Sequence, residues 1–119
     1  MEMVQTDAVA ALAALAQDNR LDVFRLLVQA GPDGLAAGNI ASELKLAPNT
    51  LTFHFDRLRQ AGLVSVRRDG RSMIYSANYD AMNSLILYLT DNCCGGSPEQ
   101  CAPAAACAPA KSKRTKTPV

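Results

Sequence analysis

The stretch Asn39–Val64, NIASELKLAPNTLTFHFDRLRQAGLV, predicts two short helices joined by a tight connection. In its first half, apolar residues recur at near-helical spacing after Asn39, a polar residue that can cap the helix. Pro48 suits the first turn of a second helix, where its missing N–H is not needed. Because the residue before a proline disfavours helical conformation, we expect the first helix to end by Ala47.

The second helix is predicted from Pro48 to Ala61 and is expected to end at Gly62 in the left-handed conformation. It should have an apolar stripe that is buried and a polar face that is not. At about 100° per residue, the stripe is Leu51, Phe55 and Leu58. Amide, hydroxyl and guanidinium groups can contact base edges and phosphates. The residues of this helix predicted to contact DNA are Asn49, Thr50, Thr52, Phe53, His54, Arg57 and Gln60. For His54, at the edge of the stripe, a half-buried structural role is the favoured alternative.

A hairpin is predicted directly after this helix. Residues 64–67 alternate apolar and polar side chains, and Asp69-Gly70 is a strong hairpin turn signal. Residues 73–77 can form the return strand. Three arginines at or near the tip are predicted to contact DNA: Arg67, Arg68 and Arg71. A basic hairpin beside a recognition helix indicates a winged helix-turn-helix, although a hairpin charged only for solubility is the alternative.

The flanking segments predict further helices and a dimer. Residues 5–17 form one predicted helix, capped by Thr6, with an apolar stripe at Val9, Leu12, Leu15 and Ala16. Residues 21–30, with Leu21 facing inward, form another, and Gly31-Pro32-Asp33-Gly34 is a turn. The last helix, residues 79–91, is capped by Asp80 and is apolar almost all round. One small domain cannot cover it, so we expect it to form a homodimer interface with the first helix.

Leu46–Val64 resembles the recognition segment of the ArsR/SmtB family of bacterial metal-responsive repressors. The family pattern is close to LxxSxxTVSHHLxxLRxAGLV, followed by a basic wing, and the resemblance extends over about residues 8–91. Gln17–Leu27 resembles the second helix of the family. The chain departs from the pattern at Ala47, where the family usually has a serine that caps the recognition helix. The resemblance implies a mainly α winged helix-turn-helix with a β-hairpin wing, acting as a homodimer on operator DNA.

Charge is concentrated on the predicted DNA-reading segment. The chain has a net charge of only +1, but residues 46–79 carry five arginines and two aspartates, a net charge of +3. No apolar stretch approaches about 20 residues, and the N-terminus lacks the basic residues of a signal peptide. We therefore expect a cytoplasmic protein with no membrane segment. No catalytic constellation stands out, so we expect no enzyme.

All four cysteines lie near the C-terminus, in a predicted domain arrangement of residues 1–92 and a largely flexible tail, residues 93–119. Thiolates without a nearby histidine favour soft, thiophilic species. Trivalent arsenic takes three sulfurs, which Cys93, Cys94 and Cys101 can supply, with Cys107 as a substitute. Antimony(III) has the same requirement, and methylarsenite needs two. Structural zinc prefers CxxC-type spacing, so a four-cysteine zinc site is less favoured.

The family resemblance narrows the possible positions of the metal-sensing site. Arsenic sensors of the family often carry a cysteine pair at the helix before the recognition helix, and zinc sensors carry Asp and His pairs on the last helix. This chain has neither, and it is similar to the subgroup whose arsenic site follows the last helix. The predicted function is an arsenite-responsive repressor. The alternatives are a thiol-redox-responsive repressor, a DNA-binding protein with unliganded tail cysteines, and a small thiol enzyme such as an arsenate reductase.

Overall fold

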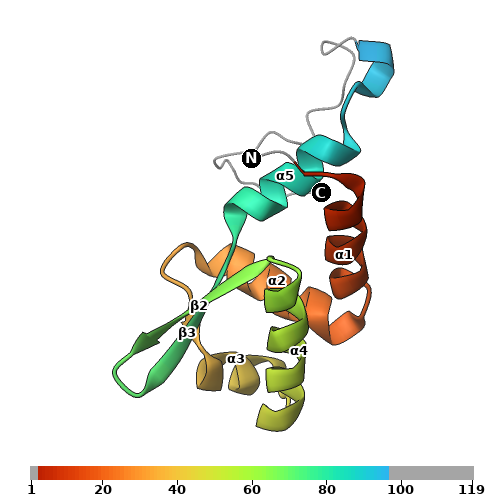
Figure 1. Cartoon of the computed structure of the whole chain (residues 1–119). Coiled ribbons are helices and arrows are strands. Elements are labelled where there is room, and N and C mark those ends of the chain that lie inside the picture. The colour runs from red at the N-terminus through yellow and green to blue at the C-terminus, as the bar shows by residue number, and fades with distance from the viewer. Residues whose placement is uncertain (1–2, 97–119) are drawn as a thin grey trace, which may run out of the picture. The chain divides into compact units, whose positions relative to one another are not determined.

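The computed structural model describes residues 3–96, which fall into two compact units divided after Tyr88. The first unit is mainly α-helical with one small sheet (Figure 1). Its elements in chain order are α1 (Gln5–Leu15), α2 (Asp18–Ala30), β1 (Leu35–Ala36), α3 (Ala37–Leu44), α4 (Pro48–Gln60), β2 (Val64–Asp69), β3 (Ser72–Ala77) and α5 (Tyr79–Leu89), whose last residue opens the second unit. No helix within residues 3–96 is long and apolar enough to cross a membrane.

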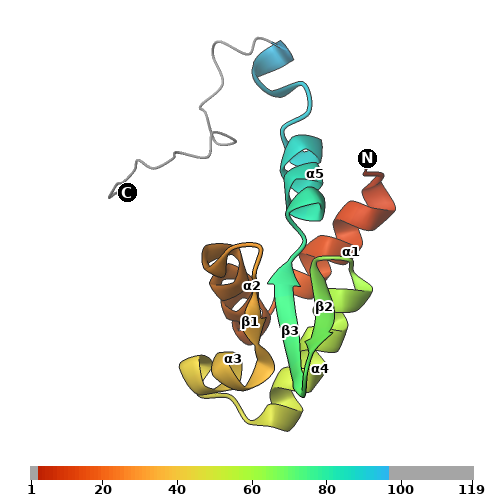
Figure 2. The ribbon, with the colours of Figure 1, turned by 90° about the vertical axis from the view of Figure 1, so that its left-hand side faces the viewer.

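The sheet is antiparallel, with the strand order β1-β3-β2. Strands β2 and β3 form the predicted hairpin, in register from Val64 opposite Ala77 to Asp69 opposite Ser72. Figure 2 shows this hairpin extending beside α4 as the wing. Strand β1 was not predicted, because two residues are too short to show an alternating pattern. The structure confirms the predicted fold class, a winged helix-turn-helix with a β-hairpin wing.

Helix α1 packs through a face turned by about 100° from its predicted apolar stripe. Its buried residues are the alanines Ala8, Ala11 and Ala14, whereas Val9 and Leu12 are 57% and 43% exposed. The small alanine side chains let α1 approach α2 and α4 closely, and the larger side chains then point outward. Val9 and Leu12 of the predicted stripe therefore lie on the surface of the helix that was expected to form the dimer interface, whereas Leu15 packs partly against the core. Leu21 of α2 was also expected inward but is 43% exposed.

Three of the predicted helix caps were also wrong. Helix α3 begins straight after strand β1, so Asn39 lies inside the helix and Ala36 is its N-cap. Helix α5 is capped by Asn78, whose Oδ1 accepts from the backbone N–H of Ala81 at 3.2 Å, and not by Asp80. Helix α1 starts after Val4 without a side-chain cap, so Thr6 lies within its first turn.

The core is a single apolar cluster built on α2 and α4. Its largest fully buried side chains are Phe55, Leu27, Ile40, Leu51, Leu58, Leu63 and Val23. Gly62 has φ of +78°, as predicted for the residue that ends the recognition helix. The backbone N–H of Leu63 then donates to the carbonyl of Leu58 at 3.0 Å, which closes the helix against the core.

The second unit is described for residues 89–96. After α5 ends at Leu89, the chain turns at Asn92, with φ of +59°, into a short 3-10 helix, η1 (Cys93–Gly96). Cys101 and Cys107, two of the predicted metalloid ligands, lie outside the described residues.

Candidate nucleic-acid interface

The recognition helix α4 is positioned by the turn before it. Lys45 adopts the left-handed conformation, with φ of +57°, and the N–H of Leu46 donates to the carbonyl of Ala41 at 3.0 Å. Pro48 then opens α4 at its first turn. Ala47 offers no side-chain cap, as the departure from the family pattern predicted. The start of α4 therefore depends on backbone geometry alone. Pro48 lessens the need for a cap, because it lacks one of the N–H groups that a cap would satisfy.

The buried face of α4 fixes the helix against the wing. Leu51, Phe55 and Leu58 are each at most 2% exposed, as predicted. The ring of Phe55 stacks on that of Tyr75 in β3, with centroids 3.6 Å apart and an interplanar angle of 12°. This stacking links the recognition helix to the wing and helps to hold them in a set relative position.

The outward face of α4 carries most of the residues predicted to contact DNA. Asn49, Thr50, Thr52, Phe53, Arg57 and Gln60 are all exposed. The hydroxyl of Thr52 donates to the carbonyl of Pro48 at 3.0 Å, which leaves its oxygen lone pairs and its methyl group for a partner. The guanidinium of Arg57 lies over the ring of Phe53, 5.3 Å from its centroid. These groups can contact both base edges and phosphates.

His54 lies in the core rather than on the outward face. It is 5% exposed, and its Nδ1 is 3.4 Å from a guanidinium nitrogen of Arg20 in α2. Because arginine only donates, Nδ1 accepts, and the proton of the neutral imidazole is on Nε2. Burial, reinforced by the positive charge of Arg20, lowers the pKa of His54 below its usual value of 6.5. The position of His54 at the edge of the apolar stripe had favoured such a structural role over DNA contact.

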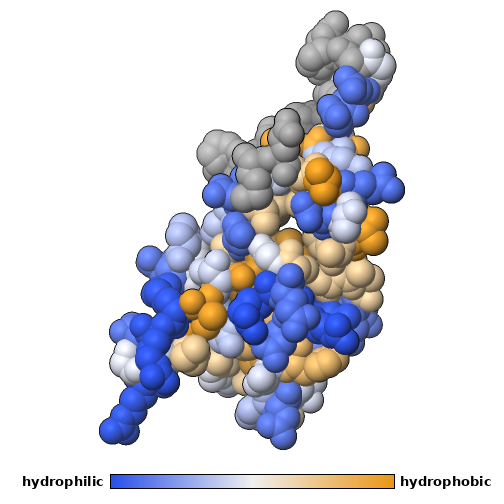
Figure 3. All heavy atoms as spheres, in the orientation of Figure 1, coloured by the Kyte–Doolittle hydropathy of each residue, from blue (hydrophilic) through white to orange (hydrophobic). Residues whose placement is uncertain are grey.

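The three arginines of the wing have different surroundings. Arg68 and Arg71 flank the turn at the tip and are exposed, and Figure 3 shows a strongly hydrophilic surface there. The guanidinium of Arg67 instead donates to the carbonyl of Asp33 at 3.0 Å, in the turn before β1. Arg67 therefore ties the wing to the body of the domain, and the tip presents two arginines to a partner.

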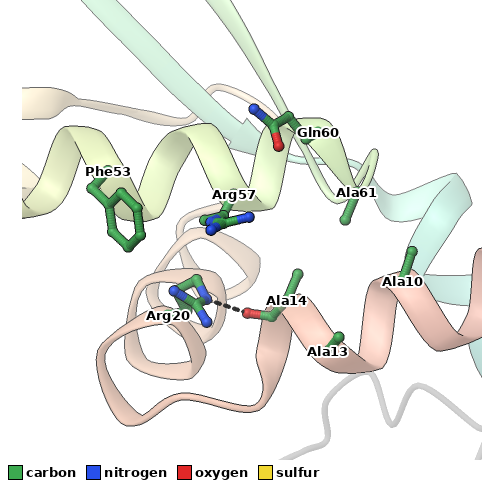
Figure 4. A pocket seen from close by; sticks show the side chains of 8 residues that line it. All are labelled: Ala10, Ala13, Ala14, Arg20, Phe53, Arg57, Gln60 and Ala61. Carbon is green, nitrogen blue, oxygen red and sulfur yellow. Dashed lines mark hydrogen bonds between the residues drawn. The ribbon is translucent and has the colours of Figure 1, made fainter.

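A pocket beside α4 adds a residue that the sequence reasoning missed. Arg20, at the start of α2, reaches it together with residues of α1 and α4 (Figure 4). Its Nε donates to the carbonyl of Ala14 at 2.6 Å. Arg20 is distant in sequence from α4, so no local spacing rule could have placed it there. The only sequence indication was its match to the family's second helix.

The cysteines are described in part. Cys93 begins η1, is partly exposed, and is disulfide-bonded in this structure. Within residues 3–96, no three Cys, His, Asp or Glu side chains come together as a metal site. The predicted ligand set, which needs Cys101 or Cys107, extends beyond that range.

Known proteins similar to this chain are regulators of transcription. A family model described as a helix-turn-helix domain matches residues 15–67. YgaV of Escherichia coli, an HTH-type transcriptional regulator, is 30% identical over 87 residues, which cover 73% of this chain and 86% of YgaV. A winged helix-turn-helix domain from Mycobacterium bovis, described as homodimeric, DNA-binding and a possible ArsR-family regulator, aligns with a TM-score of 0.60 and 26% identity. That alignment covers 73% of this chain and 81% of the domain.

The chain belongs to the ArsR/SmtB family. The nodulation protein NolR of Rhizobium meliloti is 34% identical over 80 residues, 67% of this chain. The match covers 63% of NolR, so this chain spans less than two thirds of that relative. The similarity to YgaV and to the Mycobacterium bovis domain confirms the resemblance read from Leu46–Val64 and the expectation that the chain is a transcriptional regulator and not an enzyme.

Proposed function

We propose that the protein is a repressor that binds operator DNA as a homodimer and is released by trivalent arsenic. The observation that supports DNA binding is the outward face of α4, where amide, hydroxyl and guanidinium groups are exposed beside a wing tip with two exposed arginines. In a dimer, two such helices enter successive major grooves about 34–36 Å apart. A protein that acts on operator DNA works in the cytoplasm of a bacterium.

The dimer is supported by exposed apolar side chains on α1 and α5. Val9 and Leu12 of α1, Val4 just before it and Leu87 of α5 are between 43% and 63% exposed. Figure 3 shows the apolar surface over α1. The two helices are joined by a hydrogen bond from the hydroxyl of Tyr88 to the side chain of Gln5, at 3.3 Å. Burying these residues against a second copy would remove them from water, which is the main favourable term in association.

The inducer site is proposed at Cys93, Cys94 and Cys101, with Cys107 as a substitute. Sulfur is the only metal-binding donor that this part of the sequence offers in number, which suits arsenite, antimony(III) or methylarsenite. In the binding step, three thiols displace three hydroxyl groups of arsenous acid; three As–S bonds form and three waters leave. Because Cys93 and Cys94 follow the last helix closely, binding there can favour a dimer geometry that no longer fits the operator. Couplings of this kind are typically ~1–3 kcal/mol.

The test is a DNA-binding titration followed by fluorescence anisotropy, on the promoter upstream of the gene and with a thiol reductant present. Arsenite should release the wild-type protein from DNA, and Cys93→Ser or Cys94→Ser should bind DNA normally but resist release. Release of these variants at the wild-type arsenite concentration would show that the site is wrong. Zinc serves as the matched control and should have no effect.

A thiol-redox switch is the second candidate, because Cys93 is disulfide-bonded in this structure. Here the disulfide itself would set the DNA-binding state, and no metalloid would be needed. The two candidates separate in the same titration. Release by a mild oxidant, with no response to arsenite under reducing conditions, would replace the arsenic proposal with the redox one.

A further inference from the structure

A pocket lies between α1, α2 and α4, and one of its walls is built from small residues. Its volume is about 430 Å³. Four alanines from α1 and the end of α4 line one side, and larger polar and aromatic side chains line the other. The complete lining is Ala10, Ala13, Ala14, Arg20, Phe53, Arg57, Gln60 and Ala61 (Figure 4).

The pocket carries two positive charges, and no acidic residue within residues 3–96 pairs with either of them. Arg20 and Arg57 face it from different helices, and its lining contains no carboxylate (Figure 4). Across residues 3–96, the ion pair that the structure forms is Arg59 with Asp56, which leaves both pocket arginines without an acidic partner. Two guanidinium groups around one hollow favour an anion with several oxygen atoms.

Arg20 is held in place before any ligand arrives. Its Nε donates to Ala14 in the last turn of α1, and a second nitrogen lies 3.4 Å from His54 in α4. Two of its five N–H groups are thus engaged, and the others stay available. A side chain fixed in this way loses little entropy when it binds an anion.

The position of the pocket along α4 corresponds to the rim of the major groove. Arg57 follows Asn49 by eight residues, a helical rise of about 12 Å. The N-terminal residues of a recognition helix contact the base edges. Arg57, about two turns further along α4, is therefore placed nearer the groove rim, where the phosphates lie. Arg20 is beside it, on the side of α4 where α1 and α2 pack.

We propose that this pocket binds one backbone phosphate of the operator, with Arg20 and Arg57 donating to its anionic oxygens. The proposal rests on the DNA-binding part of the proposed function and is independent of the inducer. It assigns Arg57 to a phosphate rather than to a guanine, and it makes Arg20 a DNA contact from outside the helix-turn-helix. Arg20 also bonds α1, so the contact would connect the DNA backbone to a helix of the proposed dimer interface.

The test uses operator duplexes that each carry one neutral methylphosphonate in place of a phosphate. Binding by the wild type should weaken markedly at one linkage per half-site, and Arg57→Gln should lose sensitivity to that linkage. The slope of log K against log salt should also fall by about 0.9 per lost contact, or by about 1.8 for a symmetric dimer. Arg25→Gln is the matched control, since Arg25 is an exposed arginine of α2 that lines a different pocket. It should keep the wild-type profile.

Arg57→Gln carries the test because Arg57 is exposed and its loss should not impair folding. Arg20→Lys keeps the positive charge but loses the planar guanidinium group that bonds Ala14 and His54. It should therefore reduce, but not abolish, the loss of affinity that a methylphosphonate causes at the same linkage. If Arg57→Gln remains as sensitive as the wild type at every linkage, the phosphate assignment is overturned while DNA binding stands. Saturable binding of inorganic phosphate at this pocket, seen by NMR, without any linkage effect would assign it to a free anion instead. Failure of the wild type to bind any duplex would overturn this proposal together with the proposed function.

Discussion

Phe53 and Phe55 are neighbours in sequence with opposite surroundings. Phe55 is 2% exposed and stacked on Tyr75, whereas Phe53 is 51% exposed on the outward face of α4. Helical periodicity alone placed Phe55 inside and Phe53 outside, because residues two apart on a helix point about 200° apart. The stacking of Phe55 on the wing strand could not be read from spacing, since it joins residues far apart in the chain.

Phe55→Ala should lower the free energy of unfolding by about 3–5 kcal/mol, because it removes a buried ring and leaves a cavity between α4 and β3. Phe53→Ala is the matched control and should change stability by about 0.5 kcal/mol or less while weakening DNA binding. Urea denaturation of the two variants measures the first effect, and anisotropy the second. Equal losses of stability would contradict the packing described for α4.

The lowered pKa of His54 makes stability depend on pH. The unfolded state takes up a proton at about pH 6.5, whereas the folded state resists it because the imidazole is buried beside Arg20. Unfolding free energy should therefore be fully retained above pH 6.5 and should fall as the pH drops below that value, until the folded-state pKa is passed. Urea midpoints at pH 7.5 and 5.5 measure the change. His54→Gln should have a weaker dependence in this interval, and an unchanged dependence would exclude His54 as the cause.

At the scale of elements, the wing is held to the body of the domain by strand β1 and the turn before it. Leu35 and Ala36 pair with Tyr75 and Ile74 of β3. Gly34 has φ of +77°, and a Cβ there would overlap the backbone carbonyl of Tyr75. Glycine is therefore required both by conformation and by the close approach of the two backbones. The sequence indicated a turn here, but only the structure shows that the turn touches the wing.

Gly34→Ala should destabilise the domain by about 1–3 kcal/mol and shift the wing. Gly38→Ala is the matched control, because Gly38 lies in helix α3 with open space around its Cα. It should be neutral or stabilising by about 0.5 kcal/mol, since alanine favours helix over glycine. Thermal unfolding compares the two. A destabilised Gly38→Ala with a stable Gly34→Ala would contradict the placement of β1.

For the whole molecule, the exposed apolar side chains of α1 and α5 are the main feature that one copy leaves unexplained. Leu12→Asp should raise the dissociation constant of the proposed dimer about tenfold or more, equivalent to about 1.4 kcal/mol, because it places a charge in an apolar interface. Sedimentation at micromolar concentration measures the shift toward monomer. Met73→Asp, at an exposed apolar residue of the wing, should leave the dimer intact. A monomeric wild type would exclude the two-fold model of operator binding.

The sequence by itself determined the recognition helix, the hairpin and the end of α4 at Gly62, because helical and strand periodicity, proline and glycine act over a few neighbouring residues. It also determined the family. Tertiary structure alone decided the packing face of α1, where alanines rather than Val9 and Leu12 allow the close approach to α2 and α4. It likewise set His54 against Arg20, turned Arg67 toward Asp33 and brought Arg20 beside α4. These outcomes depend on contacts between residues distant in the chain, and a local pattern carries no information about them.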